Sequence, residues 1–295
     1  FRYVYKKLNY SFGGTVSNAR YTQTDLRHGD TSNTINYLNF FPKASFKYKL
    51  SNQRSIDLSY NGNTRQPSIT QVQPLVQNND PTRVAKGNPG LRQELTHSMR
   101  ASYNDYKVLT GRYIWSSVSF TSVNDAISTS QDIVNGVYTT QYINVNGNYN
   151  GWAYLNYGFK LAKTGIRIGG HVNPSIARVN NIINGQKNTN DNNTYSGGLE
   201  FNYEKEEQWE FSFSPGIAYN DNKATISAYS TSYWSSSSDA SVSVKLPSKF
   251  RINTDVDMMF RQKTKVLNGN NNVIKWNASV SRTFLKNDQL ILELS

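Results

Sequence analysis

The sequence has 295 residues, a formal net charge of +12 and no cysteine, which excludes a disulfide framework and a thiolate metal site. A helical membrane span is also excluded, because no segment approaches the run of about 18 apolar residues that it needs. Lysine and arginine are scattered along the chain rather than clustered, so the charge indicates a solvated basic surface and not a nucleic-acid site.

The N-terminal part predicts β-strands. Residues 1–5 are expected to be the tail of a strand that begins before the given sequence. Apolar and polar residues then alternate in residues 44–50 and again in residues 56–61. Because successive side chains on a strand point to opposite faces, each segment has one apolar and one polar face.

A long excursion is predicted at residues 62–93. Pro67, Pro74, Pro81 and Pro89 lie within it, and proline cannot donate a hydrogen bond to a sheet. An ordered loop of about 30 residues is long enough to have a function of its own. It could cap a barrel lumen or contact a surface lipoprotein, and a purely architectural role is an equal alternative.

The rest of the chain continues the strand pattern. Alternation recurs in residues 209–214, 241–246 and 251–260, and Leu290, Leu292 and Leu294 predict a last strand. The whole chain then has about 14 strand segments, the first and last incomplete. Unpaired sheet edges cannot stand in lipid, because their backbone groups lack partners there. We therefore expect further strands beyond both ends of this sequence.

Short and long connections alternate along the chain. This asymmetry is typical of outer-membrane barrels, in which the short turns are periplasmic and the long loops external. The short turns are predicted near residues 5–8, 50–54, 105–109, 162–165, 204–208, 246–249 and 285–288. The long loops are predicted near residues 20–34, 62–93, 123–141, 178–194, 220–232 and 262–273.

Aromatic and basic residues gather near the short turns. Tyrosine and tryptophan settle at the headgroup level of a membrane and form a girdle there. The predicted girdle consists of Tyr3, Tyr5, Tyr48, Tyr103, Tyr157, Phe159, Tyr203, Trp209, Phe250 and Phe284. The basic residues expected to meet lipid headgroups are Lys6, Lys7, Lys49, Arg54, Lys107, Lys163, Lys249 and Lys286.

Residues 37–103 carry a recognisable order of motifs. The most specific is Gly87-Asn88-Pro89-Gly90-Leu91, followed by Glu94. Before it come Arg65-Gln66-Pro67-Ser68-Ile69, Gln73-Pro74-Leu75-Val76 and Asn79-Asp80-Pro81. This order resembles the barrel of TonB-dependent outer-membrane receptors, in particular the outer-membrane β-barrel family common in Bacteroidetes. The resemblance covers essentially the whole chain. The family usually has Lys-Pro-Glu after the leucine, whereas this chain has Arg92-Gln93-Glu94.

The resemblance implies an all-β fold: a transmembrane, antiparallel up-and-down β-barrel of about 22 strands. Residues 1–295 would be a partial barrel domain, and neither the plug domain, the TonB-contacting segment nor the remaining strands are in this sequence. The implied location is the bacterial outer membrane. The implied partners are outer-membrane lipids, the TonB complex acting through the plug, and a surface lipoprotein.

Signatures of chemistry are absent from the sequence. There is no Ser/His/Asp set, zinc spacing or phosphate-binding loop, so we expect no enzyme and no catalytic, cofactor or metal site. The acidic residues Glu204, Glu206 and Glu207 are interpreted as a solvated hairpin. The run at residues 188–192 lacks the glycine and closing glutamate of a calcium loop. Gly169-Gly170 and Gly197-Gly198 are interpreted as bulges or points of close backbone approach.

The leading hypothesis is the barrel portion of a TonB-dependent receptor that imports a glycan, a peptide or a metal chelate. Loop aromatics could stack on a sugar, although some of them must belong to a girdle. The candidates are Tyr138, Tyr142, Trp152, Tyr229 and Trp234. The alternative is a non-transporting barrel that serves as a scaffold for surface lipoproteins or a secretion assembly. A soluble glycan-binding β-protein is a distant third.

Overall fold

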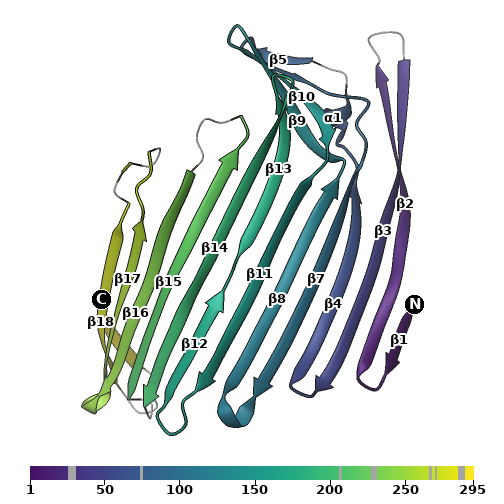
Figure 1. Cartoon of the computed structure of the whole chain (residues 1–295). Helices are drawn as coiled ribbons and strands as arrows, with labels where there is room; N and C mark the ends of the chain where they lie inside the picture. The colour runs from purple at the N-terminus through teal and green to yellow at the C-terminus, as the bar shows by residue number, and fades with distance from the viewer. Residues whose placement is uncertain are drawn as a thin grey trace.

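The alternating segments form one continuous antiparallel wall (Figure 1). The computed structural model describes residues 1–25, 31–73, 76–205, 208–226, 231–265, 268–269, 271–284 and 290–295. The strands of the wall are β1 (Arg2–Tyr5), β2 (Leu8–Asp25), β3 (Thr31–Ser51), β4 (Arg54–Arg65), β7 (Glu94–Lys107), β8 (Arg112–Asn124), β11 (Asn148–Lys160), β12 (Ile166–Val172), β13 (Ser175–Ile183), β14 (Gln186–Lys205), β15 (Trp209–Ala224), β16 (Thr231–Leu246), β17 (Phe250–Arg261), β18 (Val273–Phe284) and β19 (Leu290–Leu294).

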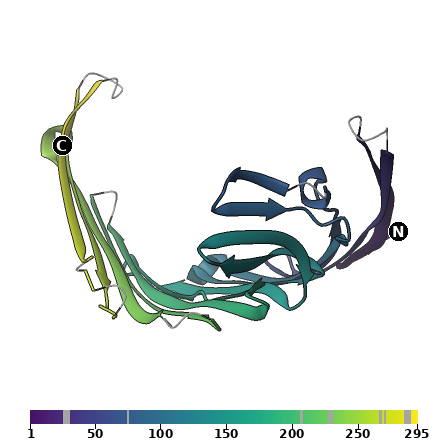
Figure 2. The ribbon, with the colours of Figure 1, turned by 90° about the horizontal axis from the view of Figure 1, so that it is seen from above.

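The strands run up and down in sequence order. β12 and β13 both pair with β11 on one side and β14 on the other, so together they make one interrupted strand. Counted in this way, the described wall has fourteen strands, as the alternation predicts. Figure 2 shows the wall as an open trough, with β1 and β19 at its two edges. The predicted all-β, up-and-down fold class is confirmed, and the total of about 22 strands stays a prediction.

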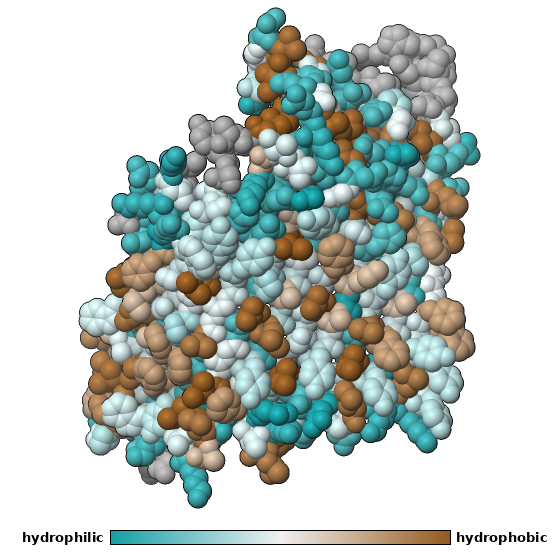
Figure 3. All heavy atoms as spheres, viewed as in Figure 1, coloured by the Kyte–Doolittle hydropathy of each residue, from teal (hydrophilic) through white to brown (hydrophobic). Residues whose placement is uncertain are grey.

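The two faces of the wall differ in polarity. Cross-strand partners share a face, and one row of partners runs through Phe12, Ala44, Tyr60, Met99 and Phe120. The parallel row on the other face runs through Ser45, Ser59, Arg100, Ser119 and Trp152. The apolar row belongs to the convex face, where Figure 3 shows hydrophobic residues over the middle and lower parts of the strands. An apolar outer band around a polar interior is the pattern of a membrane barrel.

The aromatic residues predicted as a girdle share one face. Tyr3 and Tyr48 lie on the convex side by register, as does Tyr103, which pairs with Ile56 of β4. The other seven follow the same phase of the sheet beside the short turns. This belt marks the level at which the hydrocarbon gives way to lipid headgroups.

The prediction of a long loop at residues 178–194 is wrong. β13 and β14 continue through it and meet at the two-residue turn Asn184-Gly185, whose φ angles are 48° and 73°. Positive φ at both positions is the geometry that Asn-Gly favours in a tight hairpin. Asn188 to Asn192, the run compared with a calcium loop, therefore belongs to a paired strand.

The helices of the structure are short. α1 (Ile69–Val72) lies in the first excursion, and the 3₁₀ turns η1 (Val108–Thr110) and η2 (Pro247–Lys249) make two short connections. Within the described ranges, no helix has the length and apolar character needed to cross a membrane.

Candidate functional site on the concave wall

Two excursions from the wall fold over its concave side at the long-loop end (Figure 2). The first contains α1, β5 (Val76–Asp80) and β6 (Arg83–Lys86), and the second is a hairpin of β9 (Ala126–Val134) and β10 (Val137–Val145). β6 pairs in parallel with β10, where Tyr138 lies opposite Arg83, so the two excursions share a small sheet. We call residues 66–93 and 125–147 together the cap.

The Gly-Asn-Pro-Gly-Leu motif holds the cap together. The side-chain amide of Asn88 donates to the carbonyl oxygen of Tyr142 at 2.9 Å, and its Oδ1 accepts from the Gly90 backbone at 2.9 Å. Asn144 of the second excursion bonds back to the first. Its Oδ1 accepts from the Arg92 N–H, and its side-chain amide donates to the Arg92 and Asp125 carbonyl oxygens. Every one of these contacts stays within the cap, which favours the architectural interpretation of the motif.

The cap is also joined to the wall. Leu91 is buried, and the Tyr37 hydroxyl of β3 donates to its carbonyl oxygen at 3.4 Å. Gln93 donates to the Leu38 carbonyl oxygen. Since Tyr37 lies under the cap, its face of β3 is the concave one, and Lys43 and Lys47 share that face by alternation.

Glu94, at the long-loop end of β7, joins the second excursion to the wall and bonds to the end of β4 across the base of the first excursion. One carboxylate oxygen lies 2.6 Å from Nε of Arg65, and the other accepts from the Ile127 N–H at 3.0 Å. Burial raises the pKa of Glu94, but the hydrogen bonds from Arg65 and Ile127 and the Arg65 charge outweigh it, so the pKa lies below its ordinary value. The ionised carboxylate therefore stabilises the docked cap.

An aromatic and cationic patch lies on the concave wall below the cap. The Arg100 guanidinium lies 5.4 Å from the ring centroid of Trp152, within the range of a cation–π contact. Trp115 and Tyr154 lie on the same face of β8 and β11, and Trp115 is 53% exposed. Exposed flat rings beside a guanidinium can stack on a planar or sugar-like ligand and donate hydrogen bonds to its polar groups.

A polar cluster borders this patch. Asn156 donates to the Tyr154 hydroxyl at 2.9 Å, and Nδ1 of His171 lies 3.3 Å from a carboxylate oxygen of Glu200. Tyr113 packs beside them over two glycines. A Cβ atom at Gly158 would lie 2.5 Å from the Tyr113 ring, and one at Gly169 would lie 3.0 Å from its hydroxyl. The glycines are thus points of close approach, as predicted for Gly169.

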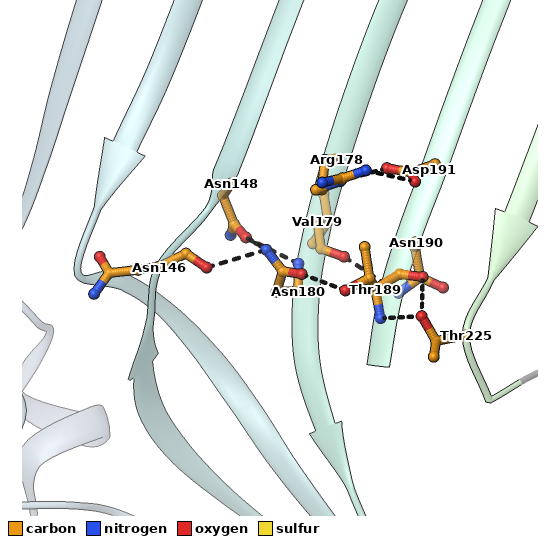
Figure 4. A network of polar contacts seen from close by, with 9 residues as sticks. All are labelled: Asn146, Asn148, Arg178, Val179, Asn180, Thr189, Asn190, Asp191 and Thr225. Atoms are coloured by element: carbon orange, nitrogen blue, oxygen red, sulfur yellow. Dashed lines mark hydrogen bonds and ion pairs between the residues drawn. The ribbon is translucent and has the colours of Figure 1, made fainter. Parts of the chain in front are cut away.

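An asparagine network braces the tall β13–β14 hairpin (Figure 4). Asn180 is fully buried, and its Nδ2 donates to Oδ1 of Asn148 at 2.9 Å and to the Asn146 carbonyl oxygen at 3.2 Å. Arg178 and Asp191 form a two-pronged ion pair at 2.6 and 2.9 Å. These groups satisfy one another, so the network is a structural support for the hairpin.

The predicted ligand-binding residues lie in different places. Trp152 lies on the concave patch, and Tyr138 and Tyr142 lie on β10 of the cap. Trp234 lies on the convex face, 5.0 Å from the Tyr219 ring, and so belongs to the membrane side. Tyr229 lies outside the described residues. The sequence analysis did not identify Trp115 and Arg100 as candidates. The available signal was the alternation itself, because both residues alternate with the apolar residues of their strands and so face the polar side.

Three comparisons with known proteins bear on identity. The sequence model of the outer membrane protein beta-barrel family matches residues 1–176. Among solved structures, the toluene transporter TodX of Pseudomonas putida is 10% identical with a TM-score of 0.31, over 95% of this chain and 80% of that chain. OmpT, an outer membrane protein of Vibrio cholerae, is 8% identical with a TM-score of 0.30, over 94% of this chain and 96% of that chain. No curated protein matches.

The family match agrees with the architecture of the wall. It covers more than half of the chain and includes the cap motifs and the wall from β1 to β12. The convex face is apolar between an aromatic belt and the long loops, so the strands themselves cross the membrane. This chain belongs to the outer membrane protein beta-barrel family, and it resides in the bacterial outer membrane as a multi-pass protein.

Proposed function

We propose that the protein is the barrel portion of a TonB-dependent receptor that imports a bulky nutrient. One observation carries the proposal: an exposed aromatic and cationic patch lies on the polar concave wall, the side of the wall over which the cap folds. A lumen lined in this way can hold a ligand while the apolar outer face remains in lipid. Candidate substrates are a glycan, a peptide or a metal chelate.

Transport would take its energy from outside this chain. An inner-membrane TonB complex would pull on a plug domain, and further strands would close the barrel. In this proposal the concave wall would contribute binding and passage rather than catalysis.

The test is energised uptake by cells that carry the full-length protein. Uptake of the substrate should fall to the passive level when the inner-membrane TonB complex is removed. At low substrate concentration it should also fall when Trp152 is replaced by alanine. Uptake that persists without the TonB complex would overturn the proposal. A full precursor without any plug domain would overturn it independently.

A second candidate is a scaffold for surface lipoproteins. The tip of the β9–β10 hairpin favours it, because Ile133, Val134 and Tyr138 are exposed large side chains on the external side. Contiguous exposed apolar groups often mark a protein contact. Under the scaffold candidate, replacing Val134 with serine should release a co-purifying lipoprotein. Under the transport proposal, the same substitution should leave energised uptake unchanged, and the scaffold candidate expects no energised uptake at all.

A further inference from the structure

An ion triad lies on the convex face at the short-turn end of β4, β7 and β8. One carboxylate oxygen of Asp105 lies 3.2 Å from Nε of Arg54, and the other lies 2.7 Å from Nη2 of Arg112. The Asp105 side chain is only 4% exposed, while the side chains of Arg54 and Arg112 are 44% and 30% exposed. One buried carboxylate therefore holds two partly exposed guanidinium groups close together.

The register of the sheet gives the level of the triad. Ile56 pairs with Tyr103 of the aromatic girdle, and Arg54 pairs with Asp105, the next residues on this face toward the short turns. The girdle marks the hydrocarbon boundary, so along β4 and β7 the triad lies just beyond it, at the level of the headgroup phosphates. Short turns of such barrels face the periplasm, and the headgroups at this level belong to the periplasmic leaflet.

The charges of this region do not cancel. Lys107 pairs with Arg112 in the next row, so three basic side chains face one carboxylate. Asp105 neutralises one of them, and a net positive charge remains at a low-dielectric boundary where attraction to an anion is strong. Guanidinium groups present planar pairs of donors that match two oxygens of a phosphate.

We propose that Arg54, Arg112 and Lys107 bind the phosphodiester of an anionic phospholipid in the periplasmic leaflet, with Asp105 as the positioning residue. The acyl chains of the lipid run along the apolar convex face above the triad. This site rests on the outer-membrane location and not on transport.

The site is narrower than the sequence suggests. Eight basic residues near short turns are predicted to meet headgroups, but Lys49 pairs with Ser55 in the concave phase of the sheet, and Lys286 lies outside the described residues. Another convex basic residue, Arg282, lies 4.8 Å from each of the rings of Phe250 and Phe284. Arg282 lies at the same short-turn end of the sheet but outside the Arg54–Asp105–Arg112 triad, so it provides a matched control.

The experiment measures the lipid retained by the full-length protein in nanodiscs of equimolar phosphatidylglycerol and phosphatidylcholine, by native mass spectrometry after mild delipidation. The wild-type protein should retain phosphatidylglycerol preferentially. Arg54→Gln and Lys107→Gln should each lower that preference by about fivefold, the effect of one basic residue near a membrane surface. Arg282→Gln should lower it by less than about twofold, because the Arg282 guanidinium already lies against the rings of Phe250 and Phe284.

Each other result contradicts the proposal. Equal losses in Arg54→Gln and Arg282→Gln would mean general attraction by the rim, and an unchanged preference in Lys107→Gln and Arg54→Gln would mean no site. Displacement of phosphatidylglycerol by inorganic phosphate at equal concentration would show that the ligand is a free anion. Heat-modifiable gel mobility checks folding, and Lys107→Gln leaves the triad intact, so the test holds if the arginine variants fold poorly.

Discussion

The side-chain amide of Asn88 donates to the carbonyl oxygen of Tyr142 at 2.9 Å and joins the two excursions that form the cap. Oδ1 of the same asparagine accepts from the Gly90 backbone N–H. Asn88 therefore stabilises its own turn and also holds strand β10 of the second excursion. A single side chain thereby couples the β4–β7 connection to the β8–β11 connection.

Replacing Asn88 with alanine should loosen the cap but leave the wall intact. Two hydrogen bonds are lost, and the free energy of opening the cap should fall by about 1–2 kcal/mol. Hydrogen exchange of the amides in residues 83–93 and 137–145 should accelerate, while exchange in β14 and β15 stays unchanged. Asn150→Ala, on the concave wall outside the cap, serves as the control. Equal acceleration in the control would contradict the assignment.

The docking of the cap should depend on pH through Glu94. Its pKa in the folded protein lies below the ordinary value of 4.5, so its contribution is complete above that value and is lost as the pH falls through the lowered pKa. Exchange of the cap amides should therefore accelerate in acid below the ordinary pKa. The step should be absent in Glu94→Gln, whose side chain has no charge to lose, and a step that persists in this variant would rule out Glu94 as its source.

Gly158→Ala should destabilise the barrel wall, because the new Cβ would meet the ring of Tyr113. The expected loss is about 1–2 kcal/mol, the usual effect of overpacking. Gly13→Ala is the matched control, since a Cβ at that position meets nothing within 4 Å. The midpoint of heat-modifiable gel mobility measures both. In a double-mutant cycle with Tyr113→Ala, the two changes should be clearly non-additive, and simple additivity would refute the contact.

Ligand binding under the proposed function should depend on the concave patch. Trp152→Ala and Arg100→Ala should each raise the dissociation constant of the imported substrate by about tenfold, the effect expected of an aromatic or arginine anchor. Trp234→Ala removes an aromatic ring of the same size from the convex face and should leave binding unchanged. Isothermal titration calorimetry with the substrate measures the dissociation constant of each variant. An equal loss of affinity in Trp234→Ala would argue against the patch as the binding site.

Asp105→Ala tests the ion triad as a structural element. Arg54 and Arg112 would face each other without the buried carboxylate between them, which should lower stability by about 2–3 kcal/mol. Asp57→Ala, which removes a carboxylate from a more exposed pair with Lys47, should cost less than about 1 kcal/mol. Similar losses in the two variants would contradict the burial argument.

The wall could be predicted from the sequence because alternation has a direct physical cause. A strand in a membrane barrel must present apolar side chains to lipid at every second position, and the girdle residues named from their proximity to short turns all share the convex face. The excursion at Pro67 and Pro89 was also predictable, since proline removes the donor that pairing requires.

The tall hairpin was not predictable from composition. Asparagine usually indicates a loop, but Asn180 and Asn188 are buried here and bond to neighbouring amides and backbone groups across the paired strands. The Asn184-Gly185 turn carried the correct signal, which the richness in asparagine obscured. The concave patch depends on which strands are neighbours, because Arg100 and Trp152 lie on β7 and β11 with β8 between them. No local pattern contains that information.

The bonds that hold the cap have a consequence for sequence variation. Asn88 and Asn144 form hydrogen bonds with backbone atoms of Tyr142, Arg92 and Asp125. These bonds constrain the path of the main chain and not the identity of the side chains along it. Outward side chains such as Tyr138 and Val134 are free to change while the cap keeps its shape. The external surface of the cap can therefore accept substitutions without losing its shape, so long as Asn88 and Asn144 stay in place.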